Sequence, residues 1–241
     1  MTIADKTVLV TGASRGIGRA LVAEALARGA ARVYAGTRQP LRHPDDRVTP
    51  LILDITSPEQ VREAAGRVRS LDILVNNAGV FLYDDASDRA AFERHLAVNF
   101  YGTYDVTRAF LPALTHSRGA IVNIGSIAAL APIPLTPAYS VSKAAAFNLA
   151  QALRSLLAGQ GVRVHSVLSG PVDTDMVRDL DVPKSSPESV ARAIFDGIDD
   201  GEEDIFPDPF SQALAEGWRT GVAKALERQN AALLDAASVT E

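Results

Sequence analysis

The clearest indication of the fold is the segment Thr7-Val-Leu-Val-Thr-Gly-Ala-Ser-Arg-Gly-Ile-Gly18. Its β-branched, apolar beginning stops at a glycine, which predicts a buried strand over 7–11. Apolar residues then recur at helical spacing from Ile17 to Arg28, and Gly29 is placed to end that helix. Glycines between strand and helix let the backbone approach a pyrophosphate, and the helix start offers free N–H groups. The stretch therefore predicts a dinucleotide-binding turn; the alternative is a glycine-rich turn without a ligand.

The rest of the chain repeats this alternation of short apolar strands and helices. Further strands are predicted at 32–36, 48–53, 71–76, 120–124, 162–168 and 204–206. Further helices are predicted from 58, from about 88 to 114 in one or two segments, over 136–158, from 187 and over 211–237. This pattern predicts the α/β class, with a doubly wound parallel sheet of the Rossmann type. We expect a single dinucleotide-binding domain over 1–241, with a C-terminal helical segment from about 211.

Composition excludes several classes of protein. The chain has 241 residues, a formal net charge of −5 and no cysteine. A disulfide scaffold, a thiolate zinc site and a cysteine nucleophile are therefore excluded. An acidic chain is a poor partner for nucleic acid, and the four histidines show no metal-ligand spacing, so we expect no metal. No targeting segment or membrane span is visible, because the apolar runs are too short, and we expect a cytoplasmic protein.

Four further motifs follow in order along the chain. Asn76-Asn77-Ala78-Gly79 ends one predicted strand, Asn99 lies in a predicted helix, Ser126 follows the strand 120–124, and Tyr139-Ser-Val-Ser-Lys143 begins a helix. Together with the glycine turn, these motifs resemble those of the short-chain dehydrogenase/reductase family. The resemblance extends over nearly the whole chain, from Thr7 to about Phe206.

The residues themselves indicate acid–base chemistry. Tyr139 and Lys143 are four residues apart, so they share one face of a helix. A free tyrosine has a pKa of about 10, and a neighbouring ammonium together with a bound nicotinamide cation would lower it. Ser126 would donate to a carbonyl oxygen on which negative charge grows. Taken alone, the Tyr–Lys pair also fits two surface side chains on an amphipathic helix, and Ser126 also fits a cap at a strand end.

The resemblance implies a catalytic set of Asn99, Ser126, Tyr139 and Lys143. In this set Asn99 would hold a water that links Lys143 to solvent, and a helix kink or a buried polar contact is the alternative. The resemblance also places Asp54 at the adenine ring and Thr174 at the nicotinamide carboxamide. The complete expected cofactor-binding set is Gly12, Ser14, Arg15, Gly16, Ile17, Gly18, Thr37, Arg38, Asp54, Ile55, Asn77, Ala78, Gly79, Tyr139, Lys143, Pro171, Val172 and Thr174.

The chain departs from the family pattern at two positions. Ser169-Gly170 stands where relatives have Pro-Gly, and we expect this change to loosen the nicotinamide end of the site. Gly125 stands where many relatives have a second serine, and we attach no functional loss to it.

The second predicted strand indicates which cofactor is used. A domain that prefers NAD usually has an acidic residue at the tip of this strand. Here Thr37 and Arg38 follow the strand, and Arg15 in the glycine turn is a second cation that suits a 2′-phosphate. We therefore expect NADP(H) to be preferred, and NAD(H) stays open as a second cofactor. The alternative is that both arginines are solvated and that Asp45 or Asp46 folds back to the ribose.

An apolar stretch with three prolines separates Ser126 from Tyr139. It predicts an apolar wall beside the reacting carbon, and packing in the core or at a subunit interface is an equal alternative. The residues of this wall would be Ile127, Leu130 and Ile133, joined by Phe81, Leu82 and Met176.

We expect an oxidoreductase that transfers a hydride between NADP(H) and a small to medium apolar ketone or aldehyde, or the corresponding alcohol. The rivals are an epimerase or dehydratase of the same fold and a non-enzymatic NADP(H)-binding regulatory or scaffold protein. The expected partners are the small-molecule carbonyl or alcohol and further copies of the chain, in a homotetramer or homodimer built on the helices at about 99–114 and 137–158.

Overall fold

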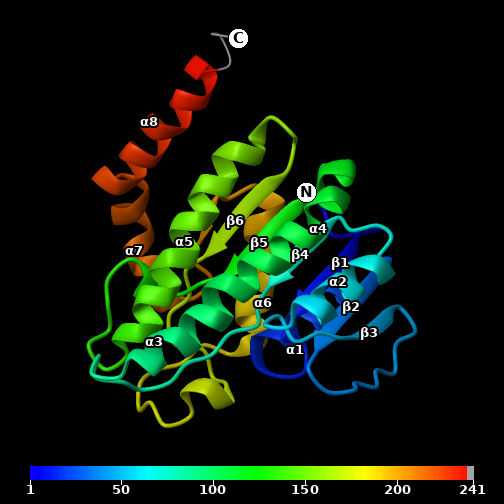
Figure 1. The fold of residues 1–241 in the computed structure, drawn as a ribbon, viewed down its shortest axis with the longest axis horizontal. Helices are drawn as coiled ribbons and strands as arrows, with labels where there is room; N and C mark the ends of the chain where they lie inside the picture. Colours follow the sequence, from blue (N-terminus) through cyan, green and yellow to red (C-terminus); the bar gives the residue numbers. More distant parts are fainter. Residues whose placement is uncertain (238–241) are drawn as a thin grey trace.

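The computed structural model describes residues 1–237, and their side chains as far as residue 233. Seven parallel strands form one sheet in the order β3-β2-β1-β4-β5-β6-β7 (Figure 1). The strands are β1 (Thr7–Thr11), β2 (Arg32–Thr37), β3 (Val48–Ile52), β4 (Ile73–Asn76), β5 (Ala120–Ile124), β6 (Arg163–Val167) and β7 (Asp204–Ile205). The predicted doubly wound parallel sheet is confirmed; residues 238–241 of the expected domain lie outside the described residues.

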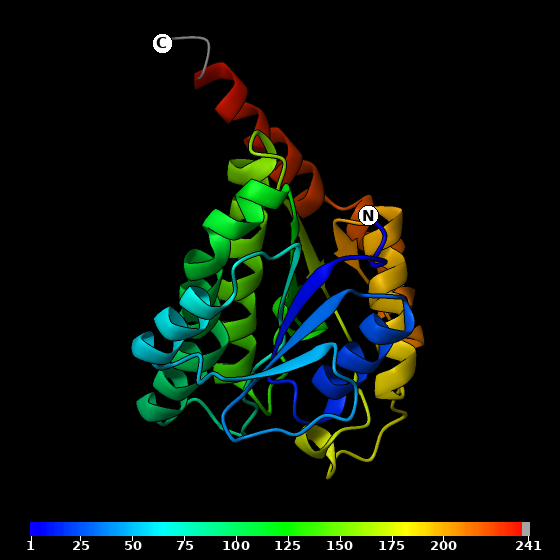
Figure 2. The same cartoon turned by 90° about the vertical axis from the view of Figure 1, so that its right-hand side faces the viewer.

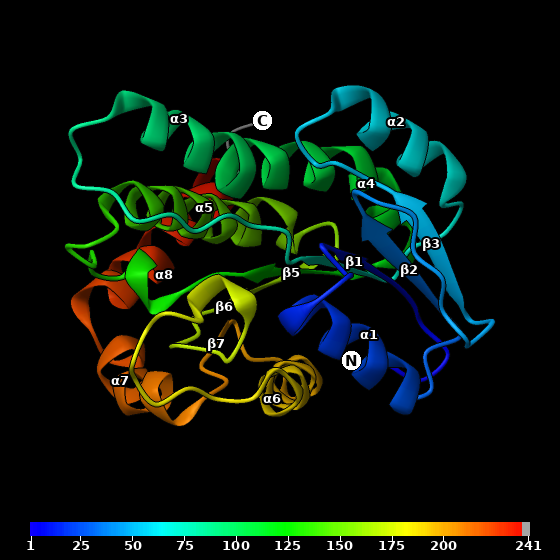
Figure 3. The same ribbon diagram turned by 90° about the horizontal axis from the view of Figure 1, so that it is seen from below.

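Helices cover both faces of this sheet (Figure 3). They are α1 (Gly16–Ala27), α2 (Pro58–Arg67), α3 (Arg89–Leu96), the π-helix η1 (Ala97–Gly102), α4 (Thr103–Ser117), the short 3-10 helix η2 (Ile127–Ala129), α5 (Pro137–Ala158), the short 3-10 helix η3 (Asp175–Val177), α6 (Pro187–Asp200), α7 (Pro209–Arg219) and α8 (Val222–Ala237). One layer contains α1 and α6, and the opposite layer contains α2, α4 and α5. Helix α8 extends beyond the body of the molecule, as Figure 2 shows. No helix within 1–237 is long and apolar enough to cross a bilayer.

Alternation along the strands explains the two layers. In β1, Val8 and Val10 pack towards α1 and α6, whereas Leu9 packs towards α2, α4 and α5. Every second residue of a strand points to the same face, so a strand covered on both sides must be apolar throughout. Leu9, Val8 and Val10 are fully buried.

Two helical predictions differ from the structure. The stretch 88–114 is helical up to Ser117, but α3 and α4 are joined through the π-helix η1. The predicted helix 211–237 is two helices: α7 begins at Pro209, where the Asp208 side chain caps it, and α8 starts only at Val222. The Gly221 break between α7 and α8 lies within an apolar helical periodicity, which hides it in the sequence.

The strand order places the functional end of the sheet. The chain leaves β1 towards β2 and β3 and returns to β4, so the order reverses between β1 and β4. In open α/β sheets, ligands bind at the carboxyl ends of the strands beside such a reversal.

Candidate active site

The glycine turn joins β1 to α1 with little space around its backbone. Gly12 and Gly16 have φ of +66° and +53°, a region that favours glycine. A Cβ atom on Gly18 would lie 2.3 Å from the carbonyl oxygen of Gly12. The first turn of α1 has no side-chain cap and no acidic residue. Its backbone N–H groups therefore form a surface suited to an anion.

The loop after β4 is tied to this turn. Asn77 Nδ2 donates to the carbonyl oxygens of Thr11 at 2.8 Å and of Gly12 at 3.2 Å. The Thr11 hydroxyl oxygen in turn accepts the backbone N–H groups of Asn77 and Ala78, each at 3.0 Å. The glycine turn after β1 and the Asn-Asn-Ala-Gly loop after β4 therefore lie side by side at the carboxyl edge of the sheet.

Tyr139 and Lys143 lie in the first two turns of α5, and the helix brings them to this edge. Lys143 Nζ donates to the carbonyl oxygen of Ile124 at 2.8 Å and lies 5.7 Å from the centre of the Tyr139 ring. Ser126 follows β5, and its hydroxyl group lies close enough to the Tyr139 phenol to lower the pKa of that phenol. Ser126 Oγ also accepts the backbone N–H of Ala128 at 3.1 Å, so this serine caps η2 as well. The structure brings together the Ser, Tyr and Lys residues predicted from the sequence.

Burial controls the protonation of the Tyr–Lys pair. Desolvation raises the pKa of Tyr139 to about 12, although the hydrogen bond with Ser126 acts in the opposite direction. Desolvation lowers the pKa of Lys143 to about 8. The expected lowering of the tyrosine pKa is therefore not found in the protein alone, because burial outweighs the opposing effect of Ser126. Near neutral pH the site holds a phenol beside a mostly charged lysine.

Asn99 lies in the π-helix η1, and both the oxygen and the nitrogen of its side-chain amide are hydrogen-bonded. Its Oδ1 accepts the backbone N–H of Val80 at 2.8 Å. Its Nδ2 donates to the carbonyl oxygen of Val80 and to Ser142 Oγ, each at 2.9 Å. Single π-turns frequently occur at functional sites. This geometry favours the alternative in which the Asn99 side chain makes a buried polar contact. The expected water would then have to bind a main-chain carbonyl group instead of the Asn99 side chain.

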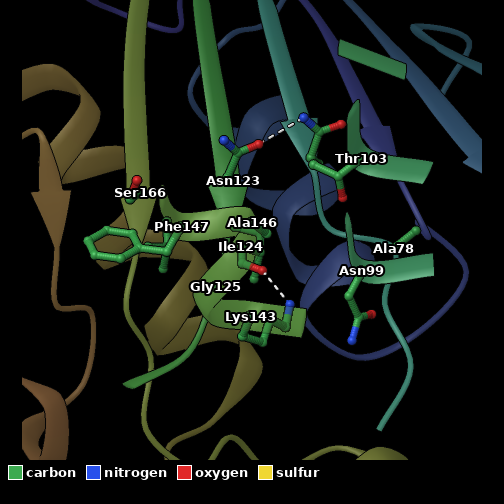
Figure 4. Close-up of a pocket in the computed structure, with 12 residues that line it drawn as sticks. Ala78, Asn99, Thr103, Asn123, Ile124, Gly125, Lys143, Ala146, Phe147 and Ser166 are labelled. Carbon is green, nitrogen blue, oxygen red and sulfur yellow. Dashed lines mark hydrogen bonds between the residues drawn. The ribbon is translucent and has the colours of Figure 1, made fainter. Parts of the chain in front are cut away.

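A small cavity of about 20 Å³ is lined by Lys143, Asn99 and Asn76 among others (Figure 4). Asn76 Nδ2 donates to Asn123 Oδ1 at 2.9 Å beside it, while Asn76 Oδ1 is buried without a partner in the described part of the chain. This volume is about that of one ordered water. Gly79 closes the front of the same region, because a Cβ there would lie 3.3 Å from Asn99 Oδ1 and 3.8 Å from Lys143 Nζ.

The Ser169-Gly170 turn is held without the proline of the family pattern. The backbone N–H of Gly170 donates to Asp208 Oδ2 at 2.8 Å, and the Ser169 hydroxyl donates to the carbonyl oxygen of Gly125 at 3.4 Å. Asp208 is buried and also accepts the backbone N–H of Ser211 at 3.0 Å, as the cap of α7. Sequence reasoning missed Asp208; its position one residue before Pro209, at a helix start, was the available signal. This anchor opposes the expected loosening of the turn.

The two predicted cations lie in different surroundings. Arg15 forms an exposed ion pair with Asp175, with an N–O distance of 3.3 Å. Arg38 lies near Asp54, where hydrogen bonds from Thr56 and the charge of Arg38 lower the carboxyl pKa. The Arg15–Asp175 pair was not predicted, because the two residues are 160 positions apart in the sequence.

The other expected cofactor residues divide by burial. Ser14 is exposed at the glycine turn, and the Thr37 hydroxyl donates to the carbonyl oxygen of Gln39 at 2.7 Å. Thr174 lies against the turn, because a Cβ on Gly16 would be 3.0 Å from its Cγ2. The side chains of Ile17, Ile55 and Val172 pack in the core, and Pro171 accepts the backbone N–H of Ser185.

An apolar groove of about 360 Å³ lies beside the loop that separates Ser126 from Tyr139. The groove is lined by Ile127, Ala128, Leu130, Ala131, Ile133, Leu214, Gly217 and Trp218. Three of the six predicted wall residues line this groove, whereas Phe81, Leu82 and Met176 do not. Helix α7 supplies the opposite wall, which was not predicted from the sequence.

Among the side chains that the structure describes, no group of three or more His, Cys, Asp or Glu is arranged to hold a metal ion.

Comparisons with known proteins agree with this architecture. A crystal structure of a short chain dehydrogenase from Burkholderia cenocepacia, in complex with NADP, is 38% identical, with a TM-score of 0.86 over 95% of this chain and 99% of that one. Mouse estradiol 17-beta-dehydrogenase 2 is 33% identical over 76% of this chain, which spans 52% of that relative. The yeast NADPH-dependent 1-acyldihydroxyacetone phosphate reductase is 35% identical over 75% of this chain and 66% of its own length. This chain thus spans about half the length of the mouse relative.

The family match covers the sheet and the site. Residues 6–184 match the family described as short chain dehydrogenase, from the start of β1 through the glycine turn, the loop after β4 and the Tyr–Lys pair to the segment after β6. This chain belongs to the short chain dehydrogenase family.

Proposed function

We propose that the protein is an NADP(H)-dependent carbonyl reductase or alcohol dehydrogenase that acts on small to medium apolar ketones or aldehydes. The observation that carries the proposal is the meeting of Ser126, Tyr139 and Lys143 at the strand edge next to the glycine turn, with Lys143 Nζ 5.7 Å from the centre of the Tyr139 ring. The neighbour that binds NADP and the yeast relative that uses NADPH support the choice of cofactor.

The residues present fit such a cofactor. The uncapped first turn of α1 and the crowded glycines suit a pyrophosphate, and no acidic side chain occupies that turn. Arg15 and Arg38 would hold the 2′-phosphate, and Lys143 the nicotinamide ribose. When bound, the nicotinamide supplies or accepts the hydride.

The protein's own residues supply the proton and hold the substrate oxygen. The Ser126 hydroxyl would donate to the carbonyl oxygen, and Tyr139 would pass its proton to that oxygen as the negative charge develops. A tyrosine pKa of about 12 keeps the phenol protonated near neutral pH, which suits a proton donor. The Lys143 ammonium would stabilise the phenolate left behind, since opposite charges a few ångströms apart favour the ionised form.

The apolar groove supports the substrate class. Its lining contains no charged side chain and includes Ile127, the residue that follows Ser126 in the chain. An apolar group attached to the carbonyl carbon would pass from water into this groove. Its burial would stabilise the bound substrate by about 25 cal/mol per Å² of apolar surface.

The test is oxidation of NADPH with a panel of ketones, aldehydes, quinones and keto-esters. We expect turnover with at least one apolar carbonyl compound, and in Tyr139→Phe a loss of about a hundredfold or more with unchanged NADPH binding. Lys143→Ala should weaken both turnover and binding. Nucleotide binding without turnover on the whole panel would favour the non-enzymatic rival or the epimerase and dehydratase class.

A further inference from the structure

The segment of residues 80–84, which follows the Asn-Asn-Ala-Gly motif, is held from one side by the helix that carries Asn99. Val80 exchanges two hydrogen bonds with the Asn99 side chain, at 2.8 and 2.9 Å. Two residues further on, the backbone N–H of Leu82 donates to His95 Nε2 at 3.1 Å. His95 and Asn99 are four residues apart, so one face of α3 and η1 holds alternate residues of the segment.

The far end of the segment is attached to the start of α5. The backbone N–H of Asp84 donates to the carbonyl oxygen of Leu135 at 3.2 Å. The Asp84 carboxylate accepts the backbone N–H of Ala138 at 3.2 Å, one residue before Tyr139. The segment therefore links the π-helix to the helix of the proposed proton donor.

Aromatic contacts transmit this position to the phenol. The Phe81 ring packs edge-on against the Tyr139 ring, with centroids 5.0 Å apart and planes at 76°. The His95 ring approaches the same ring, at 6.1 Å and 73°. Edge-to-face pairs of this kind have a preferred geometry, so Tyr139 is fixed by one ring from the segment and by the ring that anchors the segment.

His95 is fully buried, and both of its ring nitrogens are used. Because Nε2 accepts from Leu82, the ring proton lies on Nδ1, which donates to the carbonyl oxygen of Ala91 at 2.8 Å. Replacing the acceptor with a carbon atom would leave the N–H of Leu82 without the partner of this part-buried hydrogen bond. The segment would then be free to move away from the helix. The imidazole thus has two separable parts: an acceptor for Leu82 and a ring edge for Tyr139.

We propose that His95 is a positioning residue of this site: its Nε2 acceptor fixes the segment 80–84 and thereby the Tyr139 phenol in the geometry for proton transfer. The inference rests on the proposed reductase function, because its effect is on the transfer step. It concerns a residue that does not touch substrate and lies outside the Asn–Ser–Tyr–Lys set.

The experiment compares two replacements that keep opposite halves of the imidazole. His95→Phe keeps a ring against Tyr139 and removes the acceptor, whereas His95→Gln removes the ring and keeps an acceptor near the position of Nε2. The matched control is His165→Phe, which removes the other histidine whose side chain is nearly fully buried and hydrogen-bonded to a backbone carbonyl oxygen, that of Glu202. Each variant is measured for kcat and KM with the best carbonyl substrate, for Kd of NADPH and for hydrogen exchange of the Leu82 amide.

We expect His95→Phe to lower kcat about tenfold or more, with Kd for NADPH within about twofold, and to speed exchange of the Leu82 amide. His95→Gln should restore kcat to within about threefold and keep the amide protected. The proposal is overturned if His95→Phe lowers kcat no more than His165→Phe does, if kcat and NADPH affinity fall together, or if His95→Gln behaves like His95→Phe. If the unmodified chain shows no turnover, the proposed function fails. The exchange rates of the Leu82 amide in the unmodified chain, His95→Phe and His95→Gln then decide separately whether His95 holds the segment.

Discussion

At the scale of single residues, we expect the ionisation of Lys143 to set an upper pH limit for catalysis. Its pKa is lowered to about 8 by burial, so the ammonium that would stabilise the Tyr139 phenolate is lost above that pH. We expect kcat/KM for NADPH in the reduction direction to fall with a limb near pH 8, since this parameter reports ionisations of the free enzyme. A profile that stays flat to pH 10 would contradict this role for Lys143.

We propose that Arg38 carries the preference between the two nicotinamide cofactors. Its guanidinium group follows β2, and its charge lowers the pKa of Asp54, so a cation stands at the tip of this strand. We expect Arg38→Ala to raise Kd for NADPH about tenfold, equal to roughly 1.4 kcal/mol, with little change for NADH. Arg42→Ala, an exposed cation four residues away, is the control and should change neither value. Added salt should bring the Kd values of the unmodified chain for NADPH and NADH closer together. Equal Kd values for the two cofactors at low salt would refute the assignment.

At the scale of elements, Asp84 replaces the missing cap of α5. Thr136 stands at the N-cap of this helix, but its side chain makes no capping hydrogen bond; the Asp84 carboxylate accepts the N–H of Ala138 instead. A negative charge at a helix N-terminus is also favourable. Asp84→Ala should lower the free energy of unfolding by about 1 kcal/mol, while Asp84→Asn keeps an acceptor and loses less. Calorimetry should show a fall in Tm of about 2–4 °C for Asp84→Ala and none for Asp85→Ala, whose carboxylate only accepts from Ser87.

The elements also show what the sequence can predict. Strands such as β1 and β5 were placed correctly because continuous apolar runs between turn residues have few other uses. The π-helix η1 was not predicted, because it keeps helical periodicity and differs only in which carbonyl each N–H reaches. The Ser–Tyr–Lys set was predicted from the resemblance of its motifs to those of the short-chain dehydrogenase/reductase family. Asp208, Asp84 and His95 were not, because each acts through a contact with a distant segment that no local pattern records.

At the scale of the whole molecule, His165 ties stability to pH. This histidine is almost fully buried in β6, and desolvation lowers its pKa to about 4. Between pH 6.5 and 4 the unfolded chain binds more protons at this position than the folded chain, so its contribution is complete above 6.5 and is lost as the pH falls. The expected loss is about 3 kcal/mol by pH 4. Denaturation in urea at pH 7 and pH 4.5 should show a smaller pH effect in His165→Phe; an identical pH effect in both chains would disprove it.

Assembly is the remaining property of the whole molecule, and the outer sides of the π-helix and α5 bear on it. Phe147 and Leu153 lie on α5, one of the two expected interface helices, but pack within the protomer. Tyr101 and Leu156 nevertheless remain more than half exposed, at 57% and 56%. Because exposed apolar side chains on neighbouring helices favour association, we expect a homodimer or homotetramer.

Light scattering at micromolar concentration should then give two or four times the chain mass of 25.5 kDa. Leu156→Asp places a charge in the expected contact and should lower the mass. Val222→Asp adds the same charge on α8, at a residue that is 85% exposed, and should leave the mass unchanged. A mass of one chain for the unmodified protein would exclude this assembly; an equal loss of mass in both variants would move the interface from α5 towards α8.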